Sequence, residues 1–194
     1  MKFFIVKKQH IMLALCVIIA TVVLVTGSVS ILANQNRKLP IYCVQTDKKQ
    51  VAISFDAAWG NDDTETLIKI LKEYNVPATF FVVGAWVDKY PESVKALSDA
   101  GHRIENHSNT HPHMPQLSTE QIKNELESCN NKIKAVTGRC PTLLRVPYGD
   151  YDNAVLETTE SLGMFTIQWD VEPYATIGKP HNNLHSPYFS IKNT

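Results

Sequence analysis

Short apolar runs alternate with amphipathic segments along most of the chain, from residue 51 to residue 170. The apolar runs predict buried strands at 51–55, 78–83, 102–106, 142–146 and 165–169. The amphipathic segments predict helices at 63–74, 91–100, 118–137 and 152–162. Strict alternation of strands and helices predicts an α/β domain, with a parallel sheet or barrel inside and the helices outside.

Several predicted helices carry boundary signals. Ser118 followed by Gln121 forms a capping-box pattern, and Gly138 is the matching stop signal. Asp62 with Glu65 three positions later resembles a second capping box. These signals place the ends of the predicted helices near 118, 138 and 62.

The amino-terminal part differs from this pattern. Residues 11–33 include no charged side chain, and such a run is long enough to span a bilayer as a helix. Three lysines precede it and only Arg37 and Lys38 follow, a bias that favours a cytoplasmic N-terminus. A cleaved signal peptide is the alternative, but the run is long and Ile31–Ala33 is a poor cleavage site. We therefore expect residues 1–38 to be a single-pass anchor in the lipid of the cell membrane, with the body extracytoplasmic.

Composition excludes some classes of function. The 194 residues suffice for one modest domain and an extra segment, and 19 basic side chains balance 19 acidic ones. This balance gives no electrostatic reason to expect a nucleic-acid partner. The cysteines, at 16, 43, 129 and 140, lack C-x-x-C spacing, so a zinc finger is not indicated. Cys129 and Cys140 could pair outside the cytosol, but free thiols are the favoured interpretation.

Polar residues follow most of the predicted strands. They are Asp56, His107 with His111, Arg145 and Asp170. The carboxyl ends of parallel strands meet on one rim, so these side chains are expected to converge. His107 and His111 stand four apart, and on one helical turn both could bind one cation. The alternatives are a polar loop with incidental histidines, and a metal-binding receptor or chaperone built on that loop.

The same segments resemble a known family. The runs Ser54–Asp56, His107–His111, Arg145–Gly149 and Trp169–Asp170 are similar to motifs of the polysaccharide deacetylases of carbohydrate esterase family 4, the NodB homology domain. The resemblance covers residues 41–170, and 55–64 is similar to the membrane-anchored, sporulation-type branch of Firmicutes. It implies a distorted (β/α) barrel that removes N-acetyl groups from amino sugars of a cell-wall polysaccharide such as peptidoglycan.

The resemblance also implies roles for individual residues. Asp56 would be the general base, and His107 and His111 would hold a divalent metal ion, zinc, with cobalt or manganese as alternatives. Arg145 would orient Asp56 and favour its carboxylate form. The backbone N–H of Tyr148 would stabilise the oxyanion. A non-catalytic, metal-poor glycan-binding member of the same fold is the alternative.

One departure from the family motif concerns the metal. The family usually has a second aspartate after Asp56 as the third ligand, and here Ala57 stands in that position. Asp62 and Asp63 could substitute. Asp62 is expected in the helix cap, which leaves Asp63 as the preferred ligand. The alternative is that both aspartates only cap the helix and interact with its dipole.

The other departure lies at the carboxyl end. Trp169–Asp170 keeps a candidate catalytic aspartate, but the second Asp-Trp pair that follows in the family is missing. Residues 173–194 show no helical or strand period and are an atypical tail, and His185 only loosely echoes the family's Leu-x-His general acid. We expect a deacetylase domain at 39–172, truncated or frame-shifted after about residue 172. Its incomplete barrel would expose strand edges and core.

Overall fold

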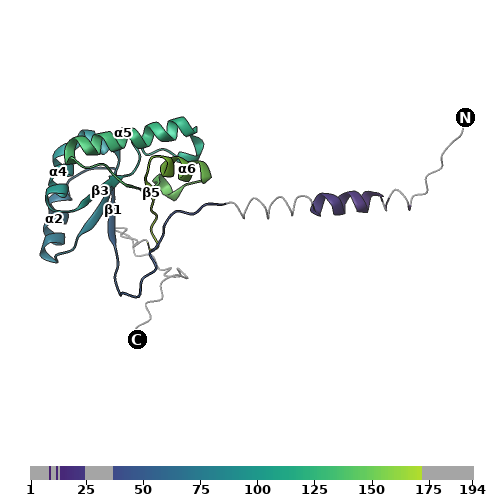
Figure 1. Ribbon diagram of the computed structural model, residues 1–194, viewed down its shortest axis with the longest axis horizontal. Helices are drawn as coiled ribbons and strands as arrows, with labels where there is room; N and C mark the ends of the chain where they lie inside the picture. The colour runs from purple at the N-terminus through teal and green to yellow at the C-terminus, as the bar shows by residue number, and fades with distance from the viewer. Residues whose placement is uncertain (1–8, 10–11, 13, 25–36, 172–194) are drawn as a thin grey trace, which may run out of the picture. The chain divides into compact units, whose positions relative to one another are not determined.

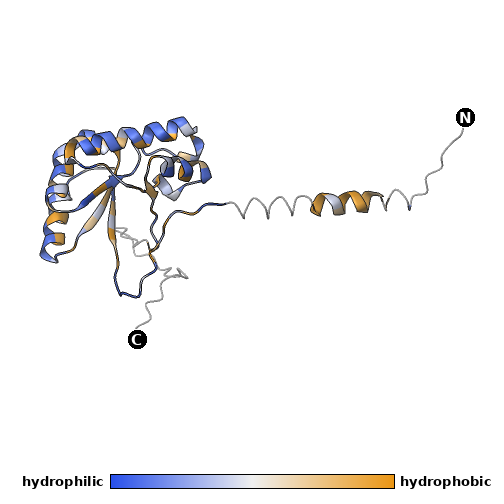
Figure 2. Cartoon of the chain, viewed as in Figure 1, coloured by the Kyte–Doolittle hydropathy of each residue, from blue (hydrophilic) through white to orange (hydrophobic). Residues whose placement is uncertain are grey.

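The computed structural model describes residues 9, 12, 14–24 and 37–171. The chain divides into two compact units, Met1–Lys38 and Leu39–Thr194. In the first unit residues 14–24 are helical and largely hydrophobic (Figure 2). No helix among the residues that the structure describes has the length and apolar character needed to cross a membrane. The proposed anchor at 11–33 lies partly outside those residues, and the tail at 173–194 lies wholly outside them.

A parallel sheet forms the centre of the second unit (Figure 1). Its strands are β1 (Ile53–Ala57), β2 (Ala78–Val82), β3 (Arg103–Asn106), β4 (Leu143–Leu144) and β5 (Phe165–Thr166). Their order in the sheet is β1-β2-β3-β4-β5, so each strand pairs with its neighbour in the sequence. A (β/α) barrel has this sequential order. In the described residues, however, β1 and β5 do not pair, and the sheet stays open.

Helices connect the strands. They are α2 (Thr64–Glu73), α3 (Gly84–Lys89), α4 (Pro91–Asp99), α5 (Thr119–Thr137) and α6 (Asn153–Ser161), with short 3-10 helices η1 (Met114–Gln116) and η2 (Pro147–Gly149). The alternation expected from the sequence is therefore confirmed, although α3 was not predicted because six residues are too few to show a period. Strands β4 and β5 are shorter than predicted.

The two predicted capping boxes have different outcomes. The Ser118 hydroxyl accepts from Gln121 N at 3.3 Å and the Gln121 side chain accepts from Ser118 N at 2.9 Å, so the box at α5 is confirmed. Gly138, with φ of 73°, ends that helix as predicted. The box predicted at Asp62 is wrong. The residue before α2 is Asp63, its backbone is helical rather than extended, and its side chain makes no capping bond.

Helix α5 links two apolar clusters of the core. Its residues Cys129 and Ile133 pack in a cluster with β2, α3 and α4, whereas Ile122 and Leu126 pack in another with β4 and α6. These four side chains are fully buried. Because α5 contributes residues to both clusters, it holds the two parts of the core together.

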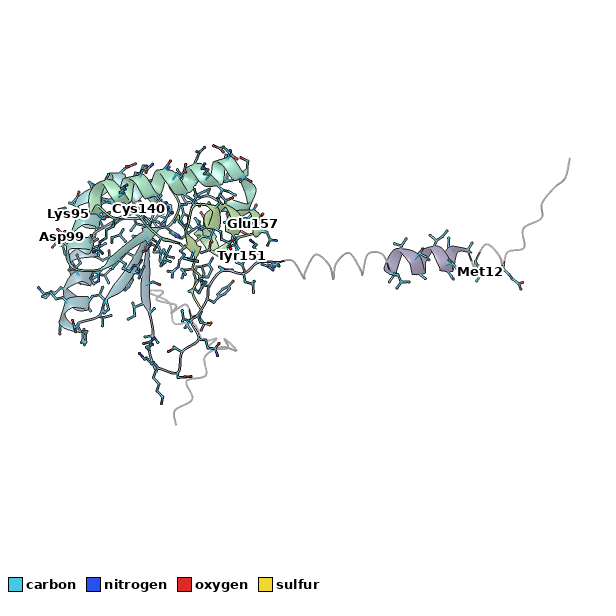
Figure 3. The ribbon with its side chains drawn as sticks, in the orientation of Figure 1. Met12, Lys95, Asp99, Cys140, Tyr151 and Glu157 are labelled. Atoms are coloured by element: carbon cyan, nitrogen blue, oxygen red, sulfur yellow. The ribbon has the colours of Figure 1, made fainter. Side chains whose placement is uncertain are left out.

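All four cysteines are free thiols, as favoured from the sequence. Cys140 is exposed (Figure 3), whereas Cys129 is buried and donates to Val82 O. Burial raises the pKa of the Cys129 thiol to about 12. Cys129 is therefore protonated at neutral pH and contributes to packing rather than to nucleophilic chemistry.

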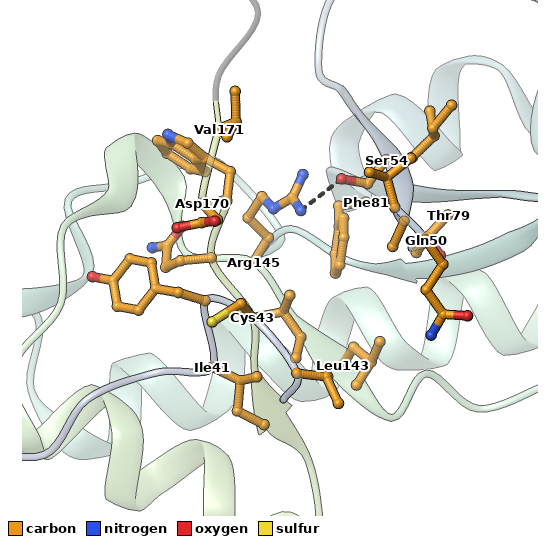
Figure 4. Close-up of a pocket in the computed structure, with 18 of the residues that line it drawn as sticks. Ile41, Cys43, Gln50, Ser54, Thr79, Phe81, Leu143, Arg145, Asp170 and Val171 are labelled. Atoms are coloured by element: carbon orange, nitrogen blue, oxygen red, sulfur yellow. Dashed lines mark hydrogen bonds between the residues drawn. The ribbon is translucent and has the colours of Figure 1, made fainter. Parts of the chain in front are cut away.

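A groove of about 550 Å³ opens between the outer strands of the sheet (Figure 4). Ile41 forms an isolated parallel bridge with Ile167, and the segment that follows Ile41 returns along the groove toward β1. Most of the lining is apolar, but Arg145 and Gln168 also contribute to it. Gln168 is 4% exposed, and neither of its side-chain amide atoms has a hydrogen-bond partner among the described residues. The open edge of the sheet thus leaves core-like surface accessible.

Candidate active site

Arg145 connects two distant parts of the sheet. It follows β4, and its Nη1 donates to Asp56 Oδ1 on β1 at 2.7 Å. Its Nη2 donates to Ser54 Oγ at 2.8 Å, and its guanidinium lies 4.1 Å from the centre of the Phe81 ring. Arg145 is 5% exposed, so its charge depends on these partners. The structure therefore brings together the predicted base and the arginine expected to orient it.

The backbone of Arg145 also fixes His107. His107 Nδ1 lies 2.7 Å from Arg145 O, and because a carbonyl oxygen only accepts, Nδ1 must carry the proton. The lone pair is then on Nε2, which lies 3.9 Å from Asp56 Oδ2. The centroid of the His111 ring is 5.0 Å from that of His107. One carboxylate and two imidazoles thus meet at the end of the sheet.

The loop that carries the histidines is irregular, so the helical turn expected from their spacing is wrong. Ser108 and His111 have φ of 66° and 62°, which is uncommon for residues other than glycine. Side chains stabilise this path: Asn106 Oδ1 accepts from Ser108 N at 2.7 Å, and Ser108 Oγ accepts from His111 N at 2.9 Å. Left-handed residues rather than helical periodicity bring the two rings together.

Two helices hold this loop in place. On α5, the Glu125 carboxylate accepts from Asn109 N and Thr110 N, each at 2.8 Å, and from Thr110 Oγ1 at 2.9 Å. On α3, Gly84 N donates to Ser108 O at 3.0 Å, and a Cβ at position 84 would collide with the Asn109 side chain. Sequence reasoning missed Glu125, because a carboxylate beside an apolar helical stripe looks like ordinary surface.

The residues fit a divalent metal ion only in part. The neutral nitrogens of His107 and His111 are suitable ligands, and the buried His111 Nδ1 has no hydrogen-bond partner in the part of the chain that the structure describes. Position 57 offers only a methyl group, and Asp63 is exposed at the start of α2. Within the described ranges, no three or more His, Cys, Asp or Glu side chains are grouped to hold a metal. The structure thus does not place Asp63 with the histidines, and its role as third ligand stays a prediction.

Two further predicted site residues lie on either side of this centre. Tyr148, in η2, has φ of 60°, and its ring centroid is 4.6 Å from that of His111. Asp170 is exposed at the groove, where Figure 4 shows it near Arg145, but the two form no ion pair. The groove is lined by Arg145 but not by Asp56 or by either histidine. The catalytic roles of Tyr148 and Asp170 stay predictions.

The imidazoles resist protonation. Burial lowers the pKa of His107 and of His111, and the nearby Asp56 carboxylate opposes this effect without overcoming it. Burial also lowers the pKa of His102, whose Nδ1 lies 3.4 Å from Ala78 N. At neutral pH the site histidines are therefore uncharged and keep the lone pairs that a metal ion requires.

These shifts predict that acid destabilises the fold. A histidine whose pKa is lowered on folding binds fewer protons than in the unfolded chain, so stability falls as the pH drops below the ordinary value of 6.5. Each histidine that stays neutral costs about 1.4 kcal/mol per pH unit below that value. Urea unfolding at pH 7.5, 6.5 and 5.5 should show this loss, and His107→Gln should reduce the slope. A stability that rises between pH 6.5 and 5.5 would contradict the assignment.

Comparison with known proteins identifies the family to which the chain is related. The polysaccharide deacetylase family matches residues 44–167. The chain is 37% identical over 131 residues to the peptidoglycan-N-acetylmuramic acid deacetylase PdaA of Bacillus subtilis, covering 67% of this chain and 50% of PdaA. It is 36% identical over 133 residues to the uncharacterized protein YlxY of the same organism, covering 69% and 42%. The chain spans about half the length of these relatives.

Solved structures show the same fold. A pseudoenzyme of carbohydrate esterase family 4 from Bacillus anthracis matches with a TM-score of 0.66 and 35% identity, over 68% of this chain and 47% of that one. A mutant of that pseudoenzyme with restored enzymatic activity matches equally well, at 37% identity over 68% and 48%. Because the family match covers more than half of this chain, the chain belongs to the polysaccharide deacetylases.

Proposed function

We propose that this chain hydrolyses N-acetyl groups from amino sugars of a peptidoglycan-type polysaccharide. The observation that carries the proposal is the double role of Arg145, which holds Asp56 through its side chain and His107 through its carbonyl. A carboxylate is thereby kept 3.9 Å from an imidazole nitrogen with a free lone pair. The similarity to PdaA supports the class of substrate.

The chemistry follows from the two carboxylate oxygens of Asp56. Oδ1 is engaged by Arg145, so Oδ2 is the oxygen that accepts a proton from water as the water attacks the acetyl carbon. His107 and His111 would hold a divalent ion, which when bound polarises the acetyl oxygen and lowers the pKa of water. The backbone N–H of Tyr148 would donate to the developing oxyanion. When the tetrahedral intermediate collapses, the C–N bond breaks and the departing nitrogen takes up the proton that Asp56 accepted, so the products are acetate and a free amino sugar.

A second candidate is a glycan-binding protein without catalytic activity. It is favoured by Ala57, because two imidazoles alone fall short of the three protein ligands typical of catalytic metal sites. The similarity to a pseudoenzyme of the same family is consistent with it. Metal content and acetate release distinguish the two candidates.

The first prediction of this proposal concerns metal affinity. His107→Ala or His111→Ala should weaken zinc binding by about tenfold or more, since each removes a ligand. Ala57→Asp should tighten it by a similar factor, because it adds a carboxylate directly after Asp56, the position at which the family usually has its third ligand. Zinc binding is measured by calorimetry, independently of activity.

Asp63→Ala is the internal control of this series. A weaker affinity would make Asp63 the third ligand, whereas an affinity equal to wild type would exclude that role. Asp62→Ala should change neither zinc affinity nor stability, since Asp62 does not cap α2.

The base is tested by Asp56→Asn. The amide oxygen can still accept from Arg145 but cannot take a proton, so acetate release should fall about 10²–10⁴-fold with zinc still bound. Asp99→Asn is the matched control: Asp99 is an exposed carboxylate on α4 that pairs with Lys95 (Figure 3). If wild-type activity is too low to measure, the same comparison is made in the Ala57→Asp background. An unchanged rate in Asp56→Asn would remove Asp56 from the mechanism.

We also propose that residues 11–33 anchor the chain in the cell membrane, with the deacetylase domain outside. The support is the uncharged run and its basic flanks. The protein should sediment with membranes and resist extraction by high salt, because the attachment is hydrophobic and salt screens only ionic contacts. Appearance of a shortened, soluble form would instead indicate a cleaved signal peptide.

A further inference from the structure

Trp59 is 83% exposed beside the candidate active site. The centroid of its indole ring lies 6.0 Å from that of the His111 imidazole, with the planes 63° apart. By contrast, Trp86 is buried and Trp169 is partly buried. An exposed indole forgoes the large free energy that its burial would release. The apolar face of Trp59 is therefore available to a ligand at this site.

The loop that presents Trp59 is fixed on both sides. Strand β1 precedes it, and Gly60 follows with φ of 60°, a left-handed turn that glycine adopts without strain. The Gly60 carbonyl accepts from Trp86 Nε1, and Asn61 Nδ2 donates to Ser93 Oγ at 3.0 Å. Since the backbone is already ordered, binding a ligand on Trp59 costs little conformational entropy.

A second exposed ring lies close to the same imidazole. Tyr148 is 59% exposed, and its ring centroid is 4.6 Å from that of His111. Trp59 comes from the loop after β1 and Tyr148 from η2, so two separate elements place aromatic rings beside His111. One face of Tyr148 is stacked on His113, with the ring centroids 4.2 Å apart, which leaves Trp59 as the more open face. Aromatic faces carry negative charge density, which attracts the weakly positive C–H face of a pyranose ring. Ligand sites of this kind combine such rings with a few polar groups.

We propose that Trp59 is a subsite for the sugar next to the one that is deacetylated. Among the described ring contacts Trp59 meets His111 and not His107, the imidazole that faces Asp56, so its ligand is a neighbouring sugar rather than the reacting one. The inference rests on the proposed function, because it concerns the same site. It specifies the ligand as an oligosaccharide of N-acetylated amino sugars, with a single sugar too short to engage both positions.

The test separates binding from hydrolysis. The full chain in detergent is titrated with the linear tetramer of N-acetylglucosamine and with the monosaccharide, in the presence of a chelator so that no hydrolysis occurs. The tetramer should bind more tightly than the monosaccharide. Trp59→Ala should weaken tetramer binding about tenfold, while Trp59→Phe should retain most of it. Tyr74→Ala, which removes another exposed aromatic at the end of α2, should bind like wild type.

The outcomes distinguish this inference from the proposed function. Equal tetramer affinity in wild type and Trp59→Ala overturns the subsite, as does absence of tetramer binding or an equal loss in Tyr74→Ala. Acetate release that does not depend on Trp59 leaves the proposed function standing and removes the subsite. Binding that depends on Trp59 without any acetate release from the zinc-loaded protein supports the subsite and removes the hydrolytic function. Circular dichroism of each variant verifies that it is folded.

Discussion

The buried guanidinium of Arg145 is the constraint on which the geometry of the site depends. A charge that is 5% exposed must be paired, and its partners are Asp56 and Ser54 at the far edge of the sheet. The carbonyl of the same residue accepts a hydrogen bond from His107. Its backbone N–H donates to Asn106 O at 3.0 Å, which fixes Arg145 relative to β3. The base and the first histidine are therefore fixed to one residue and cannot shift independently.

Features that depend on residues close together in the sequence could be predicted, whereas features that depend on distant residues could not. The alternation of strands and helices and the box at Ser118 are local patterns, and both were predicted. The box at Asp62 has the right spacing but fails, because the residue before α2 has φ of −98° and ψ of −7° instead of the extended backbone that a capping side chain needs. Spacing alone does not determine that backbone.

For the histidine loop, the sequence identified the residues but not their backbone conformation. Its motif indicated which residues matter, but not the left-handed backbone at Ser108 and His111. That backbone is stabilised by Asn106 and Glu125, whose carboxylate comes from a helix fifteen and sixteen residues further along the chain. No local propensity encodes a contact of this kind, and a turn of helix was the natural but incorrect expectation.

The residue at position 57 affects the number of metal ligands but not the hydrogen bonds that hold the site in place. The hydrogen bonds of Arg145, Asn106 and Glu125 hold the site in place, and none of them involves the side chain at position 57. These bonds therefore form with alanine at that position. Ala57 instead packs against the apolar cluster formed with β2, α3 and α4. A carboxylate at that position would have to leave this cluster or be held by a cation, since an unpaired buried charge is costly. The same hydrogen bonds can therefore serve a catalytic or a purely binding protein.

The sequential strand order has a consequence for folding. Each pair of strands joins neighbours in the sequence, so the sheet can grow by closing one short connection after another. The bonds from Arg145 to Asp56 and Ser54 span 89 and 91 residues, and closing so long a segment carries a larger entropic cost. The sheet is thus able to form before the site does. Recovery of secondary structure during refolding and recovery of a competent site are then two separate events, and the second depends on a single arginine reaching across the completed sheet.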